Sequence, residues 1–244
     1  MKLSGHTVLV TGGSSGIGRA LAASFVQRGN EVVVTGRRRE PLEAFKAEFP
    51  TAHIKISDAS IATDRIDLAD WVTREFPRLD VVVNNAGTQR KVKLTGPEPW
   101  DDTANEIDLN LGAPIHLSML LAPHLVTQPE AHILNVSSGL AFVPIALMPV
   151  YCATKAALHS FTLSLREQLK STSVKVVEII PPAVKTNLGG SHDFGEELDV
   201  YIQSVLEQLE AGALETTFGL STFASRMSRE EADATFKRMN SPQV

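Results

Sequence analysis

The segment TVLVTGGSSGIG, residues 7–18, begins with apolar and β-branched residues and continues with a run rich in glycine and serine. Residues 7–10 are apolar or β-branched, which predicts a short buried strand. Glycines stand at positions 12, 13, 16 and 18, where this strand would end and a helix would begin. Glycine permits tight turns and close approach to the backbone, and the free N–H groups of a helix N-terminus attract anions. The segment therefore predicts a strand, a turn and a helix around the pyrophosphate of a dinucleotide.

The glycine spacing leaves a second interpretation open. The common dinucleotide-binding pattern is G-x-G-x-x-G, whereas residues 12–18 follow G-x-x-x-G-x-G. A glycine-rich turn that merely packs a helix against a sheet is therefore the alternative to a cofactor site.

Short apolar runs alternate with longer segments of helical periodicity along the rest of the chain. Such alternation is typical of a parallel sheet covered by helices on both faces. We expect a single α/β domain over residues 1–244, with a Rossmann-like, doubly wound parallel sheet in three α/β/α layers. The predicted strands are residues 7–10, 31–34, 53–56, 80–83, 132–136 and 174–180.

Helices are predicted between these strands, and one later region is expected to be irregular. Pro114 should kink or break the longest of these helices. Segments rich in glycine, serine and polar residues at 188–200 and 211–228 predict loops, and we expect a mobile lid at about 188–215 that orders on ligand binding. Helical patterns cover residues 16–30, 41–49, 65–76, about 100–126 and about 151–170.

The composition excludes several functional classes. The chain has 244 residues, 43% of them hydrophobic, and a formal net charge of -5, so general affinity for nucleic acids or anionic lipids is not expected. The only cysteine, Cys152, cannot form an internal disulfide, which is typical of a reducing compartment. The histidines show no metal-ligand spacing, and there is no signal peptide or apolar run of about 18 residues. We expect a cytoplasmic protein without a metal, a nucleic-acid partner or a membrane partner.

Several motifs together resemble the short-chain dehydrogenase/reductase family, in its compact single-domain branch. Residues 11–18 match the family's T-G-x-x-x-G-x-G turn, and NNAG at 84–87 matches the element after its fourth strand. PPAVKT at 181–186 is similar to the family's P-G-x-V-x-T segment at the nicotinamide, with Pro182 in place of glycine. The match extends from about residue 5 to residue 188. The overall sequence is most similar to a bacterial subgroup named after the D-alanine esterification of lipoteichoic acid.

The resemblance implies a cofactor and a set of residues that bind it. The cofactor would be NADP(H), with NAD(H) as the alternative, and the substrate a small molecule with a carbonyl or secondary alcohol group. Asp58 stands where family members contact the adenine. The residues expected to bind the cofactor are Gly12, Ser14, Ser15, Gly16, Ile17, Gly18, Arg37, Arg38, Asp58, Ala59, Asn85, Ala86, Gly87, Tyr151, Lys155, Val184 and Thr186.

The resemblance also implies a catalytic tetrad of Asn110, Ser138, Tyr151 and Lys155. Tyr151 and Lys155 are four residues apart on a predicted helix, so their side chains share one face. Reduction of a carbonyl needs a proton donor, and free tyrosine titrates near pH 10, so a nearby ammonium is expected to favour the phenolate. By resemblance, the lysine also holds the nicotinamide ribose.

The other two members of the tetrad each have an alternative. Ser138 follows the strand at 132–136 and is expected to hydrogen-bond the substrate oxygen, with Ser137 as the rival. Asparagine is unfavourable within a helix, so Asn110 marks an irregularity. The resemblance implies a kink that holds a water linked to the lysine, and a simple irregularity ahead of Pro114 is the alternative.

Other residues near these motifs are expected to be structural. Cys152 lacks a histidine at a readable spacing and should be a packed side chain. Asp101 and Asp102 should stabilise the first turn of a helix rather than form an acid/base pair. The helix at 151–170 is more apolar than one buried stripe requires, so we expect it to contact a second copy in a homodimer or homotetramer.

Three consecutive arginines follow the second predicted strand. After VVVTG, residues 32–36, come Arg37, Arg38 and Arg39, with no acidic residue before Glu40. Proteins that use NAD carry an acidic side chain here for the ribose hydroxyls, whereas a guanidinium can hold the 2′-phosphate of NADP. We expect Arg37 to bind this phosphate, Arg38 to assist it and Arg39 to be a solvated charge. A plain solvated loop is the alternative.

Taken with the resemblance, these residues predict an NADP(H)-dependent oxidoreductase that transfers hydride between nicotinamide and a carbonyl or secondary alcohol. A non-catalytic dinucleotide-binding sensor or scaffold on the same fold is the alternative. Residues 140–150 are apolar, which indicates an uncharged substrate.

Overall fold

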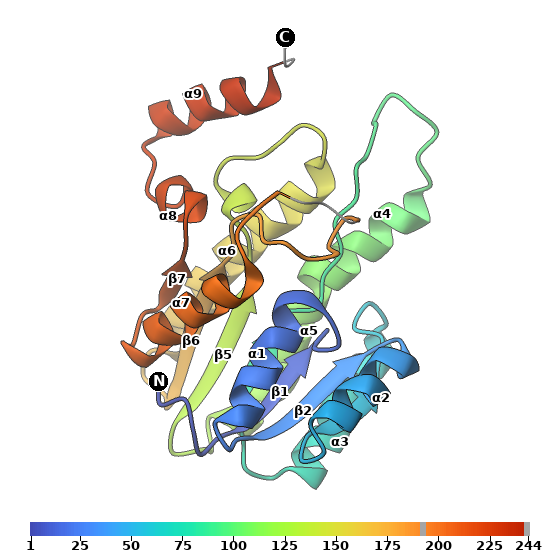
Figure 1. Ribbon diagram of the computed structural model, residues 1–244, viewed down its shortest axis with the longest axis vertical. Helices are drawn as coiled ribbons and strands as arrows, with labels where there is room; N and C mark the ends of the chain where they lie inside the picture. Colours follow the sequence, from blue (N-terminus) through green and yellow to red (C-terminus); the bar gives the residue numbers. More distant parts are fainter. Residues whose placement is uncertain (191–193, 242–244) are drawn as a thin grey trace.

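One sheet of seven parallel strands runs through the molecule in the computed structural model, which describes residues 1–190 and 194–241 (Figure 1). The strand order is β3-β2-β1-β4-β5-β6-β7, so the predicted doubly wound α/β fold is confirmed. All of the predicted strands are present, and β7 was not predicted. The strands are β1 Thr7–Thr11, β2 Glu31–Gly36, β3 His53–Ile56, β4 Leu79–Asn84, β5 Ala131–Val136, β6 Val174–Ile180 and β7 Glu215–Thr217.

Helices cover both faces of the sheet and complete three layers. Buried residues of α1, α2 and α7 join one hydrophobic cluster, and those of α3 and α5, with apolar residues of α6, join the other. The helices are α1 Gly16–Gln27, α2 Arg39–Glu48, α3 Ala62–Glu75, α4 Trp100–Ile107, the π-helix η1 Asp108–Gly112, α5 Ala113–Leu125, the 3-10 helix η2 Gly139–Ala141, α6 Pro149–Leu169, α7 Leu198–Glu210, α8 Leu220–Ala224 and α9 Arg229–Asn240.

The two clusters explain why the strands are apolar at nearly every position. Successive side chains of a strand point to opposite faces of its sheet. In β1, Val8 and Val10 belong to the cluster under α1, whereas Leu9 belongs to the cluster under α3 and α5. Both faces are therefore buried, as the unbroken apolar runs predicted.

The strand order reverses at β1, and this reversal creates a crevice. β1 pairs with β2 on one side and with β4 on the other, and both pairs are parallel. The chain therefore leaves the carboxyl ends of β1 and β4 in opposite directions, which is where open α/β sheets bind ligands. The glycine turn follows β1, residues 85–87 follow β4, and Ser138 follows β5 at the same edge of the sheet.

The long helical segment at 100–126 is interrupted as expected. The π-helix η1 separates α4 from α5, and Pro114 lies in the first turn of α5. The helix continues from η1 into α5, where the Ala113 N–H bonds the Asp108 carbonyl across the wider π-turn, so the missing N–H of Pro114 falls at this irregularity. Asp101 and Asp102 occupy the first turn of α4, as predicted.

The expected lid at 188–215 is wrong over its second half. Residues 198–210 form α7, whose side chains Tyr201, Ile202 and Val205 are buried in the core. Residues 215–217 form β7, which pairs in parallel with β6. Both elements bury apolar surface against the sheet, so they are part of the fold. Residues 191–193 of the expected lid lie outside the described residues.

The last helix, α9, projects from the body of the molecule (Figure 1). A capping box begins it, in which Ser228 accepts a hydrogen bond from the backbone of Glu231 and the Glu231 side chain accepts one in return. None of its residues is buried. Within residues 1–190 and 194–241, no helix is long and apolar enough to cross a membrane.

Candidate active site

The glycine turn after β1 lies against two other loops of the crevice. Gly12 has a φ of 63°, and a Cβ added there would stand 2.8 Å from the Cα of Ala86. Gly16 has a φ of 53°, and its Cβ would stand 3.6 Å from Thr186. Glycine is needed at both positions, because other residues rarely adopt a positive φ. The turn, the 85–87 segment and the 181–186 segment are therefore brought together.

Asn85 and Thr11 hold the turn in place. The Asn85 side chain donates hydrogen bonds to the carbonyls of Thr11 at 2.9 Å and Gly12 at 3.2 Å. The Thr11 hydroxyl accepts hydrogen bonds from the backbone N–H groups of Asn85 and Ala86. A Cβ at Gly18 would meet the Gly12 carbonyl at 2.7 Å. Thr11 was missed by the sequence analysis, although it begins the T-G-x-x-x-G-x-G motif.

The start of α1 is open to an anion. Ser15 is the N-cap residue, and its side chain makes no capping hydrogen bond. The N–H groups of the first turn therefore have no side-chain partner, although they need one. Ser14 and Ile17 flank this turn, and Ile17 packs on the core beneath it. A cradle of glycines without Cβ atoms beside a helix N-terminus fits the pyrophosphate of a dinucleotide.

The arginines after β2 differ in their contacts. Arg39 lies 3.4 Å from Glu43 and forms an exposed ion pair within α2. Arg37 and Arg38 are also exposed, and within the described part of the chain neither makes a hydrogen bond or an ion pair. Gly36, just before them, is next to Ser14, whose hydroxyl would be 3.1 Å from an added Cβ. Two exposed arginines without a side-chain partner among the described residues thus follow Gly36, which adjoins the glycine turn.

Asp58 and Ala59 follow β3 on the same side of the crevice as the arginines. The Asp58 carboxylate accepts hydrogen bonds from the backbone and hydroxyl of Ser60, at 3.0 and 2.7 Å. The Ala59 carbonyl accepts a hydrogen bond from Arg65. These bonds fix the loop that begins α3.

The segment at 181–186 is fixed by residues that follow it. Val184 is buried and bridges to Glu196, and the Glu196 N–H donates to the carbonyl of Ala183 at 2.9 Å. Gly195 has a φ of 113°, and a Cβ there would meet that same carbonyl. Among the described residues only glycines have a positive φ, so Pro182 adopts an ordinary backbone conformation in place of the family's glycine.

Tyr151 and Ser138 meet at the carboxyl end of β5. Both side chains are buried, and Ser138 caps η2 by accepting a hydrogen bond from the Leu140 N–H. Burial raises the pKa of Tyr151 to about 12, although a hydrogen bond with the Ser138 side chain lowers it. The Ser137 hydroxyl instead faces the carbonyl of Ile179. Of the two serines, Ser138 is the one that contacts the tyrosine.

Lys155 lies one turn beyond Tyr151 on α6, and it is also buried. Its ammonium donates a hydrogen bond to the Val136 carbonyl at 2.8 Å and lies 5.6 Å from the centre of the Tyr151 ring. Burial lowers the pKa of Lys155 to about 8, and the charge of Glu178 opposes this shift. The expected lowering of the tyrosine pKa is not seen here, because desolvation outweighs every other effect on that group.

Asn110 holds the loop that follows β4. Its side chain lies in η1, donates to the Thr88 carbonyl and accepts from the Thr88 N–H, both at 2.8 Å. A Cβ at Gly87 would be 3.1 Å from the Asn110 side chain and 3.8 Å from the Lys155 ammonium. The irregularity expected at Asn110 is therefore present, and both the asparagine and the lysine lie close to Gly87.

Glu106, one turn before Asn110, was missed by the sequence analysis. Its side chain is fully buried and accepts a hydrogen bond from the Arg90 N–H at 3.2 Å, while its other oxygen has no partner. Burial raises the pKa of Glu106, and its charge in turn raises the pKa of Tyr151. Glu106 and Asn110 together fix the loop from Thr88 to Arg90.

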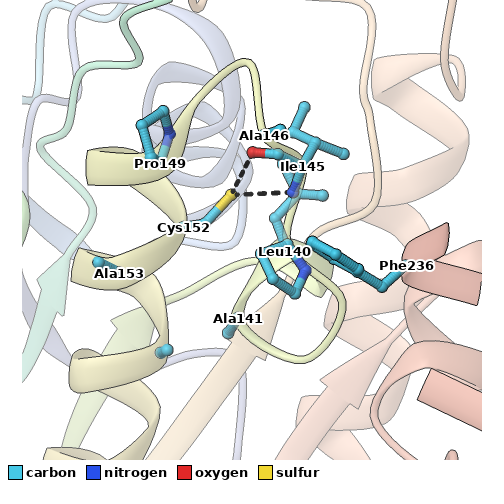
Figure 2. A pocket seen from close by; sticks show the side chains of 10 residues that line it. Leu140, Ala141, Ile145, Ala146, Pro149, Cys152, Ala153 and Phe236 are labelled. Carbon is cyan, nitrogen blue, oxygen red and sulfur yellow. Dashed lines mark hydrogen bonds between the residues drawn. The ribbon is translucent and has the colours of Figure 1, made fainter. Parts of the chain in front are cut away.

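An apolar pocket of about 390 Å³ lies between α6, the loop after β5 and α9 (Figure 2). None of the tetrad side chains lines it. Phe236 of α9 closes one side, and the Cys152 sulfur points to the backbone of Ile145, as Figure 2 shows. Cys152 is thus a packed side chain, as expected. No cluster of metal-binding side chains occurs among the residues that the structure describes.

Comparison with known proteins agrees with this geometry. The family model of the short chain dehydrogenases matches residues 6–196. An oxidoreductase of Bacillus subtilis (strain 168), which bears the name DltE and is described as uncharacterized, is 44% identical over 248 residues, covering 98% of either chain. This relative confirms the resemblance to the bacterial subgroup.

Two solved structures share the whole fold at lower identity. A short chain dehydrogenase from Burkholderia cenocepacia in complex with NADP has a TM-score of 0.87 at 22% identity, covering 99% of this chain and 100% of that one. A short chain dehydrogenase/reductase from Burkholderia phymatum in complex with NAD has a TM-score of 0.86 at 19% identity, covering 100% and 98%. The chain described here therefore belongs to the short-chain dehydrogenase/reductase family of NAD(P)-dependent oxidoreductases.

Proposed function

We propose that this protein is an NADP(H)-dependent oxidoreductase that transfers hydride between nicotinamide and a carbonyl or secondary alcohol. One observation carries the proposal. Tyr151 and Ser138 are both buried, the Ser138 side chain lowers the pKa of the Tyr151 phenol, and the Lys155 ammonium is one turn away on the same face of α6. A carbonyl oxygen placed against these two hydroxyls would be polarised by both and could receive a proton from one.

Tyr151 is protonated at neutral pH, which suits reduction. Its pKa, raised by burial to about 12, keeps the proton on the phenol. The alkoxide that develops when a carbonyl accepts hydride is far more basic, so proton transfer from Tyr151 to that oxygen is favourable. Ser138 orients the oxygen. In the oxidative direction the ammonium of Lys155 would help Tyr151 to accept the proton.

The crevice supports the choice of a phosphorylated dinucleotide. The pyrophosphate would rest on the glycine cradle and the open start of α1, and among the described residues Arg37 and Arg38 have no partner for their charge. When bound, the nicotinamide supplies or accepts the hydride. Lys155, Val184 and Thr186 would hold its end of the cofactor, and Asp58 and Ala59 the adenine end. Solved relatives in complex with NADP are consistent with this assignment.

Two copies of this chain would pair through α6. Ala153, Ala156 and Leu163 are exposed on one face of this helix, opposite the face that carries the tetrad. An apolar helical face of this kind is typical of a subunit contact. Light scattering at micromolar concentration should find a dimer or tetramer, and a monomer would refute the pairing.

A non-catalytic sensor or scaffold is the competing function. It would need the glycine cradle, but it would have no use for a buried Tyr151 hydroxyl against Ser138. Oxidation of NADPH with a panel of uncharged ketones, aldehydes and quinones separates the two functions. Tyr151→Phe keeps the ring and removes the proton donor, so turnover should fall by about a hundredfold or more while NADPH still binds. Equal turnover in this variant would exclude the mechanism.

A further inference from the structure

A row of buried polar side chains crosses the sheet beneath α6. Asn84 of β4, Asn135 of β5 and Glu178 of β6 pair in register as neighbouring residues. The Asn84 amide donates to the Asn135 side chain at 2.8 Å, and the Asn135 amide donates to the Thr162 hydroxyl of α6 at 3.0 Å. Buried polar groups are costly without partners, so such a row in the middle of an apolar sheet requires a reason.

Glu178 is the one acidic member of this row, and it is fully buried. One carboxylate oxygen lies 2.8 Å from Nδ1 of His159, and the other has no hydrogen-bond partner. An ionised carboxylate only accepts hydrogen bonds, so Nδ1 must carry the proton. The ring of Phe142 packs against His159 at 4.7 Å and holds the imidazole in position.

His159 and Lys155 are one turn apart on the helix face that covers Glu178. Lys155 makes no ion pair with any described residue, and its hydrogen bond goes to a backbone carbonyl. The negative charge of Glu178 nevertheless reaches it and raises the pKa of Lys155 against the effect of burial. The Val136 carbonyl that holds Lys155 pairs in register with Ile179, the residue after Glu178, so the carboxylate and the ammonium lie at the same end of β5 and β6.

The other charged groups around this pair act elsewhere. Glu106, on α4, acts on Tyr151 rather than on Lys155. Glu215 is the register partner of Glu178 on β7, but it is partly exposed and lies 3.4 Å from Arg166. Solvent screens that exposed pair. Among the residues that the structure describes, Glu178 is thus the one buried carboxylate whose charge acts on Lys155.

We propose that Glu178, held by His159, is a positioning residue that keeps Lys155 in its ammonium form at neutral pH. Its catalytic consequence rests on the proposed function, because there the ammonium holds the ribose hydroxyls and assists Tyr151. The electrostatic coupling itself does not depend on turnover. Without the carboxylate, the buried lysine loses its proton at a lower pH. Without a hydrogen-bond donor at residue 159, the carboxylate is no longer held under α6, and its effect on the lysine is weaker.

The titration of Lys155 tests the coupling directly. In protein labelled with ¹³C at the lysine ε-carbons, the Lys155 signal is the one missing from Lys155→Arg. Glu178→Gln should lower the pKa of Lys155 by about one unit or more, as loss of a nearby opposite charge does. Glu215→Gln is the matched control, since it makes the same charge change at the register partner of Glu178 on β7, where the side chain is exposed to solvent. An unchanged lysine titration in Glu178→Gln would overturn the proposal.

His159 gives a second test if Glu178→Gln does not fold. His159→Gln keeps an N–H donor for the carboxylate, whereas His159→Leu removes it. The lysine pKa should fall in His159→Leu and stay near the wild-type value in His159→Gln. Equal titration in these two variants would refute the role of His159 and, with it, the proposal.

The pH dependence of cofactor affinity tests the consequence. The dissociation constant for NADPH, measured by fluorescence, should begin to rise at a lower pH in Glu178→Gln than in wild type, by the same shift as the lysine titration. A shifted lysine with an unshifted affinity profile would refute the positioning role. Absence of turnover with every carbonyl tested would refute the proposed function, and the lysine titration would still decide the coupling.

Discussion

Arg37→Ala gives the sharpest test of cofactor preference. The Arg37 guanidinium is exposed at the end of β2 and has no partner in the described part of the chain, so it is free to form charge-assisted hydrogen bonds to a 2′-phosphate. NADH lacks this phosphate. The substitution should therefore weaken the binding of NADPH and leave that of NADH unchanged.

The magnitude follows from the kind of contact that is lost. A hydrogen bond to a charged group is worth about 1.5 to 3 kcal/mol, which corresponds to roughly ten- to a hundredfold in affinity. Solvent reaches this position and screens the charges, so the lower end of that range is expected. Because the Arg37 side chain makes no hydrogen bond or ion pair with any residue that the structure describes, its loss should not change the melting temperature.

Arg39→Ala is the matched control. It removes the same side chain two residues away, but Arg39 pairs with Glu43 on α2, and such exposed pairs contribute little. The Michaelis constants for NADPH and NADH are measured for wild type and both variants. Only Arg37→Ala should raise the constant for NADPH.

Gly36→Asp combined with Arg37→Ile should reverse the preference, because the new carboxylate can accept hydrogen bonds from the ribose hydroxyls and repels a phosphate. An added Cβ at Gly36 stands 3.1 Å from the Ser14 hydroxyl, so Ser14 has to move slightly. Wild-type protein that used NADH as well as NADPH would refute the phosphate contact and make the arginines a plain solvated loop.

Two further predictions concern the crevice in the absence of ligand. Gly12→Ala forces a side chain into a positive φ, which costs about 1 to 3 kcal/mol, and also pushes it against the backbone of Ala86. Gly29→Ala is the control, because Gly29 has a φ of 78° but open space around it. The control should lose less stability and retain NADPH binding. If Gly12→Ala and Gly29→Ala lose the same free energy of unfolding in denaturant titrations, the contact with Ala86 is excluded. Lys155 has a folded pKa of about 8, below its unfolded value of about 10.4, so the unfolded state binds more protons and the free energy of unfolding should rise with pH between these values. Lys155→Met should remove that rise, and an unchanged slope would show that other groups cause it.

The strands and the first half of the sheet were predictable because their signal is local. Each β-branched run is apolar at nearly every position, which occurs when both faces of a strand are buried. The irregularity at Asn110 was also predictable, since Pro114, four residues later, has no N–H to donate to the preceding turn. These features depend on neighbouring residues alone.

The C-terminal third was predicted poorly because polar composition was given more weight than periodicity. Tyr201, Val205 and Leu209 recur at helical spacing and are buried in α7, yet the glycines around this segment suggested a loop. Ser228 and Glu231 form a capping box whose sequence pattern marks the start of α9. The helical spacing and the capping box are both present in the sequence, and they predict the structure of this region better than its glycine content does.

Glu106 and Glu178 could not be identified from sequence as parts of the site. Glu106 stands in a polar helical segment and Glu178 in an apolar strand, and neither has a partner at a fixed sequence spacing. Only the fold makes Glu106 the neighbour of Arg90 and places Glu178 under His159. Their fully buried carboxyl groups act on opposite members of one pair, since Glu106 raises the pKa of Tyr151 and Glu178 that of Lys155.

This arrangement favours a neutral phenol beside a charged ammonium. Both carboxylates disfavour loss of a proton, Glu106 from Tyr151 and Glu178 from Lys155. Burial has the same effect as Glu106 on the tyrosine but opposes Glu178 at the lysine. Of Tyr151 and Lys155, the lysine is therefore the one whose charged form is supported by a single residue, Glu178. If the pair works as an acid for carbonyl reduction, loss of Glu178 should change the pH dependence through Lys155 and leave the protonation of Tyr151 near neutral pH intact.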